Sequence, residues 1–226
     1  MKLRGCKWLL WMALWGWVCA PVCMAALPEV GQALVTTQTW TGDLDGLVRR
    51  RVVRVLVCYS KTFYFLDGAQ QRGITYDLLR EFEEYLNKRL HTGVLRIEVV
   101  IVPVRRDELL PGLVAGRGDI AAANLTITPE RGQLVAFSEP FARGVSELPV
   151  TTRRHQPISC AEDLVGLPVY VRYSSSYYES LEGLNARLRA AERPLVQMNT
   201  VNESLEDEDI LEMVQAGQRT DRKAHV

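Results

Sequence analysis

The sequence predicts an α/β protein built as two β/α lobes that enclose a ligand cleft, with a second lobe that is incomplete. Three observations predict this class. Apolar runs typical of strands alternate with helical patterns in a β-α-β-α-β order, which indicates a parallel sheet with helical crossovers. An extended stretch follows, and the β/α pattern then restarts. Polar side chains stand where the predicted strands end, which is the edge of such sheets at which ligands bind.

The first 26 residues are predicted to be a targeting segment. Lys2, Arg4 and Lys7 precede the apolar run 8–22, and small residues suited to cleavage follow it. A cleaved signal peptide is the favoured interpretation. An uncleaved anchor stays open, because the 20 uncharged residues 8–27 are long enough to span a bilayer. Both alternatives predict an exported chain.

The composition is that of a soluble globular protein, with 47% hydrophobic and 24% charged residues. Without the three basic residues of the targeting segment, 24 basic side chains stand against 27 acidic ones. Such a balance argues against nucleic-acid binding, which needs a basic excess on one face. The three histidines have no ligand spacing, so no metal and no cofactor are expected.

Two cysteines, Cys58 and Cys160, lie outside the targeting segment. A disulfide between them is open in an oxidising compartment. The favoured interpretation is two separate thiols, with Cys58 buried, because Cys58 falls inside an apolar run that predicts a strand.

The first lobe is predicted at 51–147, after a polar, glycine-containing stretch at 27–50 that indicates a linker or a short helix. The β-branched run 52–57 predicts a strand buried on both faces. The apolar positions of 75–90 recur at helical spacing. The other predicted elements are an aromatic loop at 59–72, a strand at 95–104, a short helix at 106–115 and a strand at 120–123.

The second, partial lobe is predicted at 148–217, after an extended crossover at 144–152. Its predicted elements are a capping box at 159–162, a strand at 168–173, a helix at 177–191, a strand at 195–199 and a helix at 204–216. Residues 206–209 are all acidic, and we interpret them as a solvated helix cap rather than a cation site. Residues 218–226 lack apolar periodicity, which predicts a disordered tail.

The most informative motif is the block 124–131, which follows the predicted strand 120–123. Asn124 and Thr126 bring an amide and a hydroxyl to the end of this strand. Thr128 and Pro129 are typical of a helix start, and Arg131 follows within the first turn. An arginine, hydroxyls and a helix N-terminus together predict a site for an anion, most naturally a carboxylate. A capped helix with a solvated arginine is the alternative.

Residues 73–78, 118–120, 124–131 and 137–140 resemble the bacterial extracellular solute-binding proteins of family 3. The resemblance implies a periplasmic-binding-protein-like fold, in which Arg131 holds a ligand α-carboxylate. It also implies neighbouring polar contacts, an aromatic cover from the loop after the first strand, and a hydroxyl pair from the second lobe. The implied ligand-binding residues are Phe63, Tyr64, Phe65, Asn124, Thr126, Arg131, Ser175 and Ser176.

Residues 169–181 and 205–214 look like the N-terminal module of membrane-bound lytic murein transglycosylase F-like proteins. In that group the module is implied to be regulatory and to sense cell-wall fragments, ahead of a catalytic domain that this chain lacks. A complete binding protein of family 3 continues further and supplies an acidic residue for the ligand amino group. The resemblance therefore implies a truncated chain, with that acidic residue falling after residue 226.

These observations predict a periplasmic module that binds a small carboxylate-bearing ligand, such as an amino acid or a cell-wall peptide. A membrane permease or a fused transglycosylase domain is the expected partner. The alternatives are a truncated regulatory module of a lytic transglycosylase and a remnant that binds nothing. An enzyme is not expected, because no G-x-S-x-G motif is present and the serines 174–176 have no visible base.

Overall fold

The computed structural model of the chain describes residues 38–151 and 158–216. The predicted signal peptide at 1–26, the start of the predicted linker and the predicted tail at 218–226 lie outside the described residues. The elements, in chain order, are α2 (Leu44–Arg50), β1 (Val52–Val57), β2 (Phe65–Asp67), β3 (Gln70–Arg72), α3 (Ile74–Arg89), β4 (Glu98–Pro103), η1 (Arg106–Glu108), α4 (Leu109–Val114), β5 (Ile120–Ala121), α5 (Pro129–Leu134), η2 (Ala161–Leu164), β6 (Pro168–Val171), α6 (Ser176–Ala190), β7 (Gln197–Thr200) and α7 (Asp207–Gln215).

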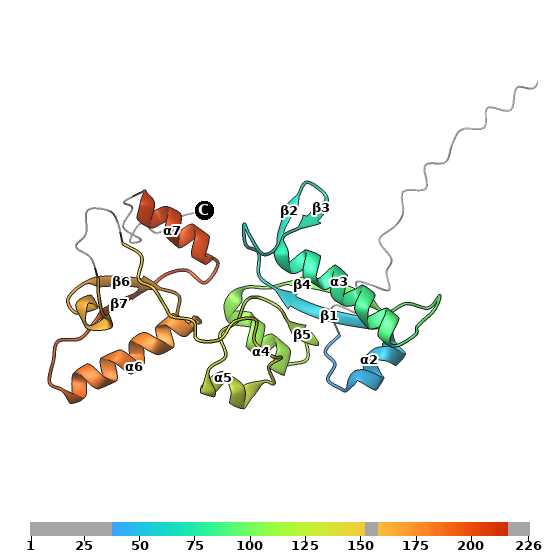
Figure 1. The fold of residues 1–226 in the computed structure, drawn as a ribbon, viewed down its shortest axis with the longest axis horizontal. Helices are drawn as coiled ribbons and strands as arrows, with labels where there is room; N and C mark the ends of the chain where they lie inside the picture. The colour runs from blue at the N-terminus through green and yellow to red at the C-terminus, as the bar shows by residue number, and fades with distance from the viewer. Residues whose placement is uncertain (1–37, 152–157, 217–226) are drawn as a thin grey trace, which may run out of the picture.

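The described elements form two lobes that lie side by side (Figure 1). The first lobe contains α2 to α5, and the second contains η2 to α7. In the first lobe, β1 is the central strand of a parallel sheet with the order β4-β1-β5. The predicted β-α-β-α-β unit is therefore confirmed.

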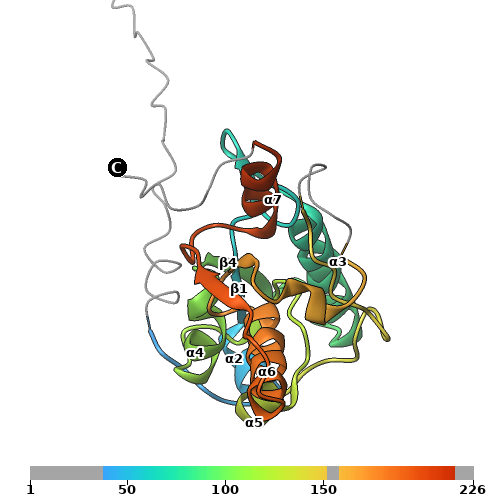
Figure 2. The same ribbon diagram turned by 90° about the vertical axis from the view of Figure 1, so that its left-hand side faces the viewer.

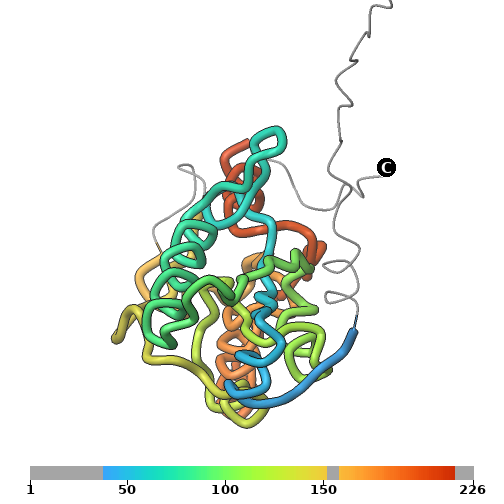
Figure 3. The backbone as a smooth tube through the Cα atoms, turned by 90° about the vertical axis from the view of Figure 1, so that its right-hand side faces the viewer, coloured from blue at the N-terminus to red at the C-terminus, as the bar shows by residue number. Residues whose placement is uncertain are grey.

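Helices cover both faces of this sheet, because the side chains of β1 alternate between two apolar clusters. Val53, Val55 and Val57 pack with Leu79 and Leu86 of α3. On the opposite face, the neighbouring β1 residue Leu56 and then Cys58 pack with Leu109 of α4. Figures 2 and 3 show α3 and α4 on opposite sides of β1 and β4. The strand is buried on both faces, as predicted.

A buried ion pair ties β1 to the residue that precedes β5. Arg54 is 0% exposed, and its guanidinium donates a hydrogen bond of 2.9 Å to Asp119 Oδ1. Asp119 Oδ2 accepts from the backbone N–H of Arg54 at 2.7 Å and from Arg50 Nη2 at 2.6 Å. Arg50 ends α2, which lies within the stretch 27–50 that was predicted to be a linker or a short helix.

The stretch 59–72 is not the plain loop that was predicted. β2 and β3 pair antiparallel within it and form a hairpin. Gly68 and Ala69 form the two-residue turn, with Gly68 at φ 62°, and a glycine at the first position of such a turn is a signal that the sequence carries. Gly73 follows at φ 116°, where an added Cβ would lie 2.4 Å from the carbonyl oxygen of Phe63. The close approach of these two backbone segments therefore requires glycine.

The described part of the second lobe contains one pair of parallel strands, β6 and β7, with Val169 opposite Met198. Leu184 and Leu188 of α6 form its core together with Val196. None of the helices in 38–151 and 158–216 is long and apolar enough to cross a membrane.

The ends of several elements differ from the predicted ones by a few residues. β4 begins at Glu98 rather than at residue 95, and β5 ends at Ala121. The capping box lies one residue later than predicted, since Asp163 Oδ2 accepts from the backbone N–H groups of Ser159 and Cys160. These ends depend on local hydrogen bonds, which sequence patterns locate only to within a few residues.

Candidate functional site

Arg131 lies in the first turn of α5, and its side chain contacts the second lobe. Thr128 is the N-cap, and its hydroxyl accepts the backbone N–H of Arg131 at 3.4 Å. Arg131 is only 6% exposed. The alternative of a solvated arginine on a capped helix is therefore wrong.

The guanidinium of Arg131 contacts the start of α6 in the second lobe. Its Nε donates to Glu179 Oε1 at 2.9 Å, and its Nη2 donates to the carbonyl oxygen of Ser174 at 2.9 Å. A carboxylate and a carbonyl from the second lobe thus both bind the arginine of the first. Glu179 could not be predicted from the sequence, because no local pattern links residues that are 48 positions apart.

Of the serines predicted to contact the ligand, one bridges the lobes and the other caps a helix. Ser176 Oγ donates to Thr126 Oγ1 at 3.0 Å, so these two hydroxyls meet across the cleft. Ser175 is the N-cap of α6, and its hydroxyl accepts from Tyr178 N and donates to Arg172 O at 2.7 Å. The hydroxyl of Ser175 therefore stabilises the start of α6.

Asn124 lies in the segment between the end of β5 at Ala121 and the start of α5. It is exposed and adopts the left-handed conformation, with φ 49°. Asparagine tolerates this conformation better than most residues, and it directs the backbone from the strand toward α5.

The three aromatic residues of the predicted cover, Phe63, Tyr64 and Phe65, differ in their burial. Phe63 and Phe65 are half-buried at the hairpin. Tyr64 is 3% exposed and belongs to the core of the first lobe, where its hydroxyl donates to Gln71 Oε1 at 2.9 Å. The aromatic ring that reaches the space between the lobes is that of Tyr59, which is half exposed.

A pocket of about 360 Å³ lies between the lobes. The first lobe lines it with residues that follow β1 and β4, and the second lobe lines it with residues that follow β7. Its lining residues are Cys58, Tyr59, Pro103, Val104, Arg105, Arg106, Glu108, Glu203, Ser204 and Glu206. The carboxyl ends of the strands of both lobes thus meet at one space, as predicted for a cleft.

Ser174 links this pocket to Arg131. Its carbonyl oxygen accepts from Arg131, and its hydroxyl and backbone N–H both donate to the carboxylate of Glu203, which lines the pocket. The arginine site and the pocket are therefore two parts of one interlobe region.

The acidic stretch 206–209 caps α7, as predicted, but Glu206 within it is not solvated. Glu206 is buried, and its two carboxylate oxygens each accept from Arg106 Nε at 3.0 Å. Burial lowers the pKa of the Arg106 guanidinium, but its hydrogen bonds to Glu206 and the charge of Glu206 raise it, and the net shift is upward. The pair joins the two lobes at the pocket.

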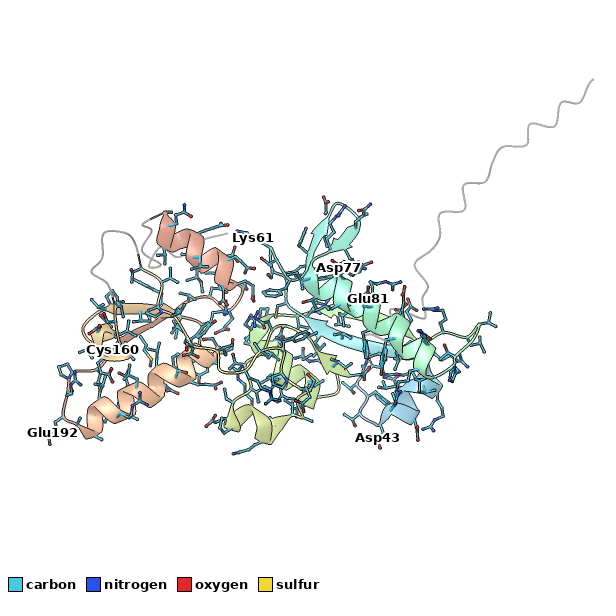
Figure 4. The ribbon with its side chains drawn as sticks, in the orientation of Figure 1. Asp43, Lys61, Asp77, Glu81, Cys160 and Glu192 are labelled. Carbon is cyan, nitrogen blue, oxygen red and sulfur yellow. The ribbon has the colours of Figure 1, made fainter. Side chains whose placement is uncertain are left out.

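The other acids of this stretch also have partners. Asp207 binds Arg172, Glu208 accepts from Ser60 Oγ at 2.7 Å, and Asp209 pairs with Lys61 at 3.0 Å. Figure 4 labels Lys61, which lies next to α7. The stretch still caps α7, since Asp209 accepts from the backbone N–H of Glu206. Within the described residues, no group of three or more histidines, cysteines and acids could hold a metal ion.

Cys58 and Cys160 are separate thiols, one buried and one exposed, as favoured from the sequence. Cys160 lies in the second lobe, beside the sheet of β6 and β7 (Figure 4). Burial raises the pKa of the Cys58 thiol from 9.0 to about 12, although the nearby Arg106 opposes the shift. A buried thiol with a raised pKa is unreactive, since the thiolate is the nucleophile.

We therefore expect iodoacetamide at about pH 8 to alkylate Cys160 and to leave Cys58 unmodified in the native protein. The Cys58 thiol stays protonated at this pH, and it becomes reactive when urea unfolds the chain. Peptide mass spectrometry measures each site separately. Equal modification rates of the two cysteines in the native protein would contradict the buried position of Cys58.

Several proteins similar to this chain carry the same name. A membrane-bound lytic murein transglycosylase F from Pseudomonas fluorescens is 29% identical over 168 residues, which are 74% of this chain and 32% of that protein. The protein of this name from Ectopseudomonas mendocina is 30% identical over 171 residues, 74% of this chain and 31% of that protein. The chain spans about a third of the length of these relatives.

Solved structures with a similar fold include an ancestral amino acid-binding protein described as a precursor of cyclohexadienyl dehydratase. It matches with a TM-score of 0.59 and 24% identity, over 76% of this chain and 69% of that one. An ancestral arginine-binding protein bound to arginine matches with a TM-score of 0.54 and 23% identity, over 74% of this chain and 67% of that one. These likenesses confirm the predicted α/β, periplasmic-binding-protein-like fold.

The family model described as bacterial extracellular solute-binding proteins, family 3, matches residues 53–219. This range includes both lobes except α2 and the first residue of β1, together with Arg131 and the residues around the pocket. The chain therefore belongs to family 3 of the bacterial extracellular solute-binding proteins.

Proposed function

We propose that the chain is a periplasmic module, exported through its N-terminal 26 residues, that closes its two lobes over a small carboxylate-bearing ligand. An amino acid or a cell-wall peptide is the proposed class of ligand. The observation that carries the proposal is that the buried Arg131 of the first lobe already binds a carboxylate of the second lobe, that of Glu179. Its surroundings are therefore suited to a carboxylate.

A ligand carboxylate would take the place that the Glu179 carboxylate occupies against Arg131. Arginine offers donors in a planar fork that matches a carboxylate, and such charge-assisted hydrogen bonds are among the stronger ones. The hydroxyls of Thr126 and Ser176 form a hydrogen bond with each other, and the backbone of Thr126 contacts Arg131. They would add hydrogen bonds to the ligand from both lobes. These contacts would stabilise the closed arrangement of the lobes when the ligand binds.

The adjoining pocket would hold the rest of the ligand. Its volume of about 360 Å³ falls in the range of small-molecule sites. Tyr59, Pro103 and Val104 offer apolar surface, and Arg106 and Glu203 offer polar groups. A few polar groups on a mostly apolar wall are typical of such sites.

The names of similar proteins support this class of ligand. Two similar folds are those of amino acid-binding proteins, one of them bound to arginine. A second candidate role, as the regulatory module of a lytic transglycosylase that senses cell-wall fragments, is favoured by the 168-residue match to membrane-bound lytic murein transglycosylase F. A permease would be the partner in the first role, and a fused catalytic domain would be the partner in the second.

Calorimetric titration of the protein with the twenty standard L-amino acids and with muropeptides tests the proposal. We expect at least one ligand to bind, and Arg131→Ala to weaken that binding by about thirtyfold or more, or roughly 2 kcal/mol. The reason is that the ligand carboxylate would be desolvated without a paired cation.

Glu179→Gln is the matched control, because it removes the competing carboxylate and keeps the shape of the side chain. We expect it to bind the same ligand more tightly than the wild-type protein does. Equal affinity of the wild type and Arg131→Ala would contradict the assignment of Arg131. Absence of binding by both the wild type and Glu179→Gln, together with protease sensitivity, would favour the non-binding remnant.

A further inference from the structure

The connecting segment between the lobes, residues 141–151, is exposed along its whole length. It forms no helix and no strand, and within the described residues none of its backbone groups forms a hydrogen bond with another backbone group. Its apolar side chains face water, with Phe141 at 95% and Leu148 at 81% exposed. A segment with free N–H and C=O groups and exposed apolar side chains is a template for pairing with another strand.

The described chain passes between the lobes once. The elements up to α5 belong to the first lobe, and those from η2 onward belong to the second. The other contacts between the lobes are noncovalent, such as the pairs of Arg131 with Glu179 and of Arg106 with Glu206. A second lobe that is tied by one exposed segment can form the same contacts with the first lobe of another copy of the chain.

Gly144 sets the direction in which the chain continues toward the second lobe. It lies at φ 64°, in the left-handed region, so the connecting segment bends at this residue. Glycine adopts both this conformation and the extended one, because it has no Cβ. In the bent form the second lobe lies against the first lobe of its own chain. In the extended form the segment would carry it toward a second copy.

The sequence of the connecting segment is complementary to itself. When two copies pair antiparallel about Val145, Arg143 of each copy lies opposite Glu147 of the other. Pro149 lies opposite Phe141 in this register. With Val145 of both copies at a non-hydrogen-bonded position, Pro149 falls at such a position too, so its missing N–H leaves no gap in the ladder.

We infer that two copies of the chain exchange their second lobes, with Gly144 as the hinge and the connecting segments paired antiparallel. Each interlobe region would then contain Arg131 of one copy and Glu179 of the other. The exchange keeps the interlobe contacts of the single chain and adds the pairing of the segments, so rising protein concentration favours it. A two-stranded ribbon alone is only marginally stable, and the exchanged lobes supply the rest of the interface. The inference does not depend on the proposed function.

Replacing the hinge glycine tests the inference in a direction opposite to simple destabilisation. Gly144→Val should raise the association constant of the dimer by about tenfold or more, because valine disfavours the left-handed bend and readily adopts the extended form. Sedimentation equilibrium of the full-length chain measures this constant. Gly93→Val is the matched control, since Gly93 is also left-handed, at φ 61°, and an added Cβ meets no atom within 4 Å at either glycine.

The wild type should form dimers as its concentration rises, and Gly93→Val should leave the association constant unchanged. An unchanged constant in Gly144→Val would overturn the inference. A wild type and a Gly144→Val variant that both stay monomeric at every concentration would overturn it too, and would assign the exposed segment to a different partner.

A charge exchange tests the register. Arg143→Glu places a glutamate opposite Glu147 of the second copy at two positions, and it should weaken the dimer by about fivefold or more. Adding Glu147→Arg restores opposite charges and should return the association constant to that of the wild type. Glu139→Gln is the control, since it removes only the partner of Arg143 within its own chain, at 2.6 Å. A double variant as weak as Arg143→Glu would overturn the pairing.

Disulfide trapping distinguishes exchange of the lobes from pairing of whole molecules. The hydroxyls of Thr126 and Ser176 lie 3.0 Å apart between the lobes. Thr126→Cys in one copy and Ser176→Cys in a co-expressed second copy should form a disulfide between the copies only when the lobes are exchanged. Both copies also carry Cys160→Ser, which removes the exposed thiol.

Thr126→Cys expressed alone is the control for trapping and should form no dimer-linking disulfide. Both cysteine substitutions in one chain establish that the two positions can form the bond. Dimers that lack the disulfide between Thr126→Cys and Ser176→Cys copies would overturn the exchange.

Discussion

Replacing Asp119 with alanine is expected to lower the free energy of unfolding by about 3–5 kcal/mol. Asp119 is the buried carboxylate that pairs with Arg54, and both side chains lie almost wholly out of water, at 3% and 0% exposed. The substitution leaves the buried guanidinium of Arg54, a residue of the central strand β1, without its counter-charge. The three carbonyl oxygens that also bind Arg54 do not neutralise its charge.

Urea unfolding followed by circular dichroism measures this loss. Asp119→Asn is the second variant, since it keeps the shape and removes only the charge, and it should lose stability too. Asp67→Ala is the matched control, because the pair of Asp67 and Arg72 is exposed and should contribute less than about 1 kcal/mol. Similar losses of stability in Asp119→Ala and Asp67→Ala would contradict the stabilising role of the buried pair.

Replacing Glu206 with glutamine is expected to open the lobes. It should raise the free energy of the closed arrangement relative to the open one by about 3–5 kcal/mol. Glu206 and Arg106 lie in different lobes, 100 residues apart in the sequence, and each is largely buried. Glutamine keeps the shape of the side chain, but it leaves Arg106 without its counter-charge. Opening of the lobes would return that arginine to water.

Small-angle X-ray scattering measures this opening as an increase in the radius of gyration. Glu212→Gln is the control, since Glu212 pairs with Lys61 at an exposed position and should have little effect. The double variant Arg106→Gln and Glu206→Gln should recover part of the closed population, because no buried charge is left unpaired in it. Identical scattering of Glu206→Gln and Glu212→Gln would refute the role of this pair.

Much of the fold could be predicted because its signals are local. The β-branched run of β1, the helical spacing of α3 and the Thr128-Pro129 start of α5 each depend on residues within one element. The order of these elements then determined the parallel sheet of the first lobe. The hairpin of β2 and β3 was missed although its two-residue turn begins with Gly68, because its strands have only three residues each.

The candidate site could be predicted only in part. The local pattern around Arg131 indicated an anion site, and the structure gives this arginine a carboxylate partner. The pattern could not indicate which carboxylate, because Glu179 follows 48 residues later in another lobe. The burial of Glu206 within the acidic stretch 206–209 could not be predicted for the same reason. Its partner Arg106 is 100 residues away, so the local pattern shows only a run of charges, which is typical of a solvated surface.

The sequence by itself determined the class of the protein, the order of its strands and helices, and the arginine on which the proposed carboxylate site depends. These features follow from periodicity, capping and strand propensity, which act over a few neighbouring residues. Only the tertiary structure decided that Tyr64 is a core residue, that Glu179 binds Arg131 and that Glu206 joins the lobes. Burial and ion pairing depend on which distant segments meet, and that information arises when the two lobes pack together.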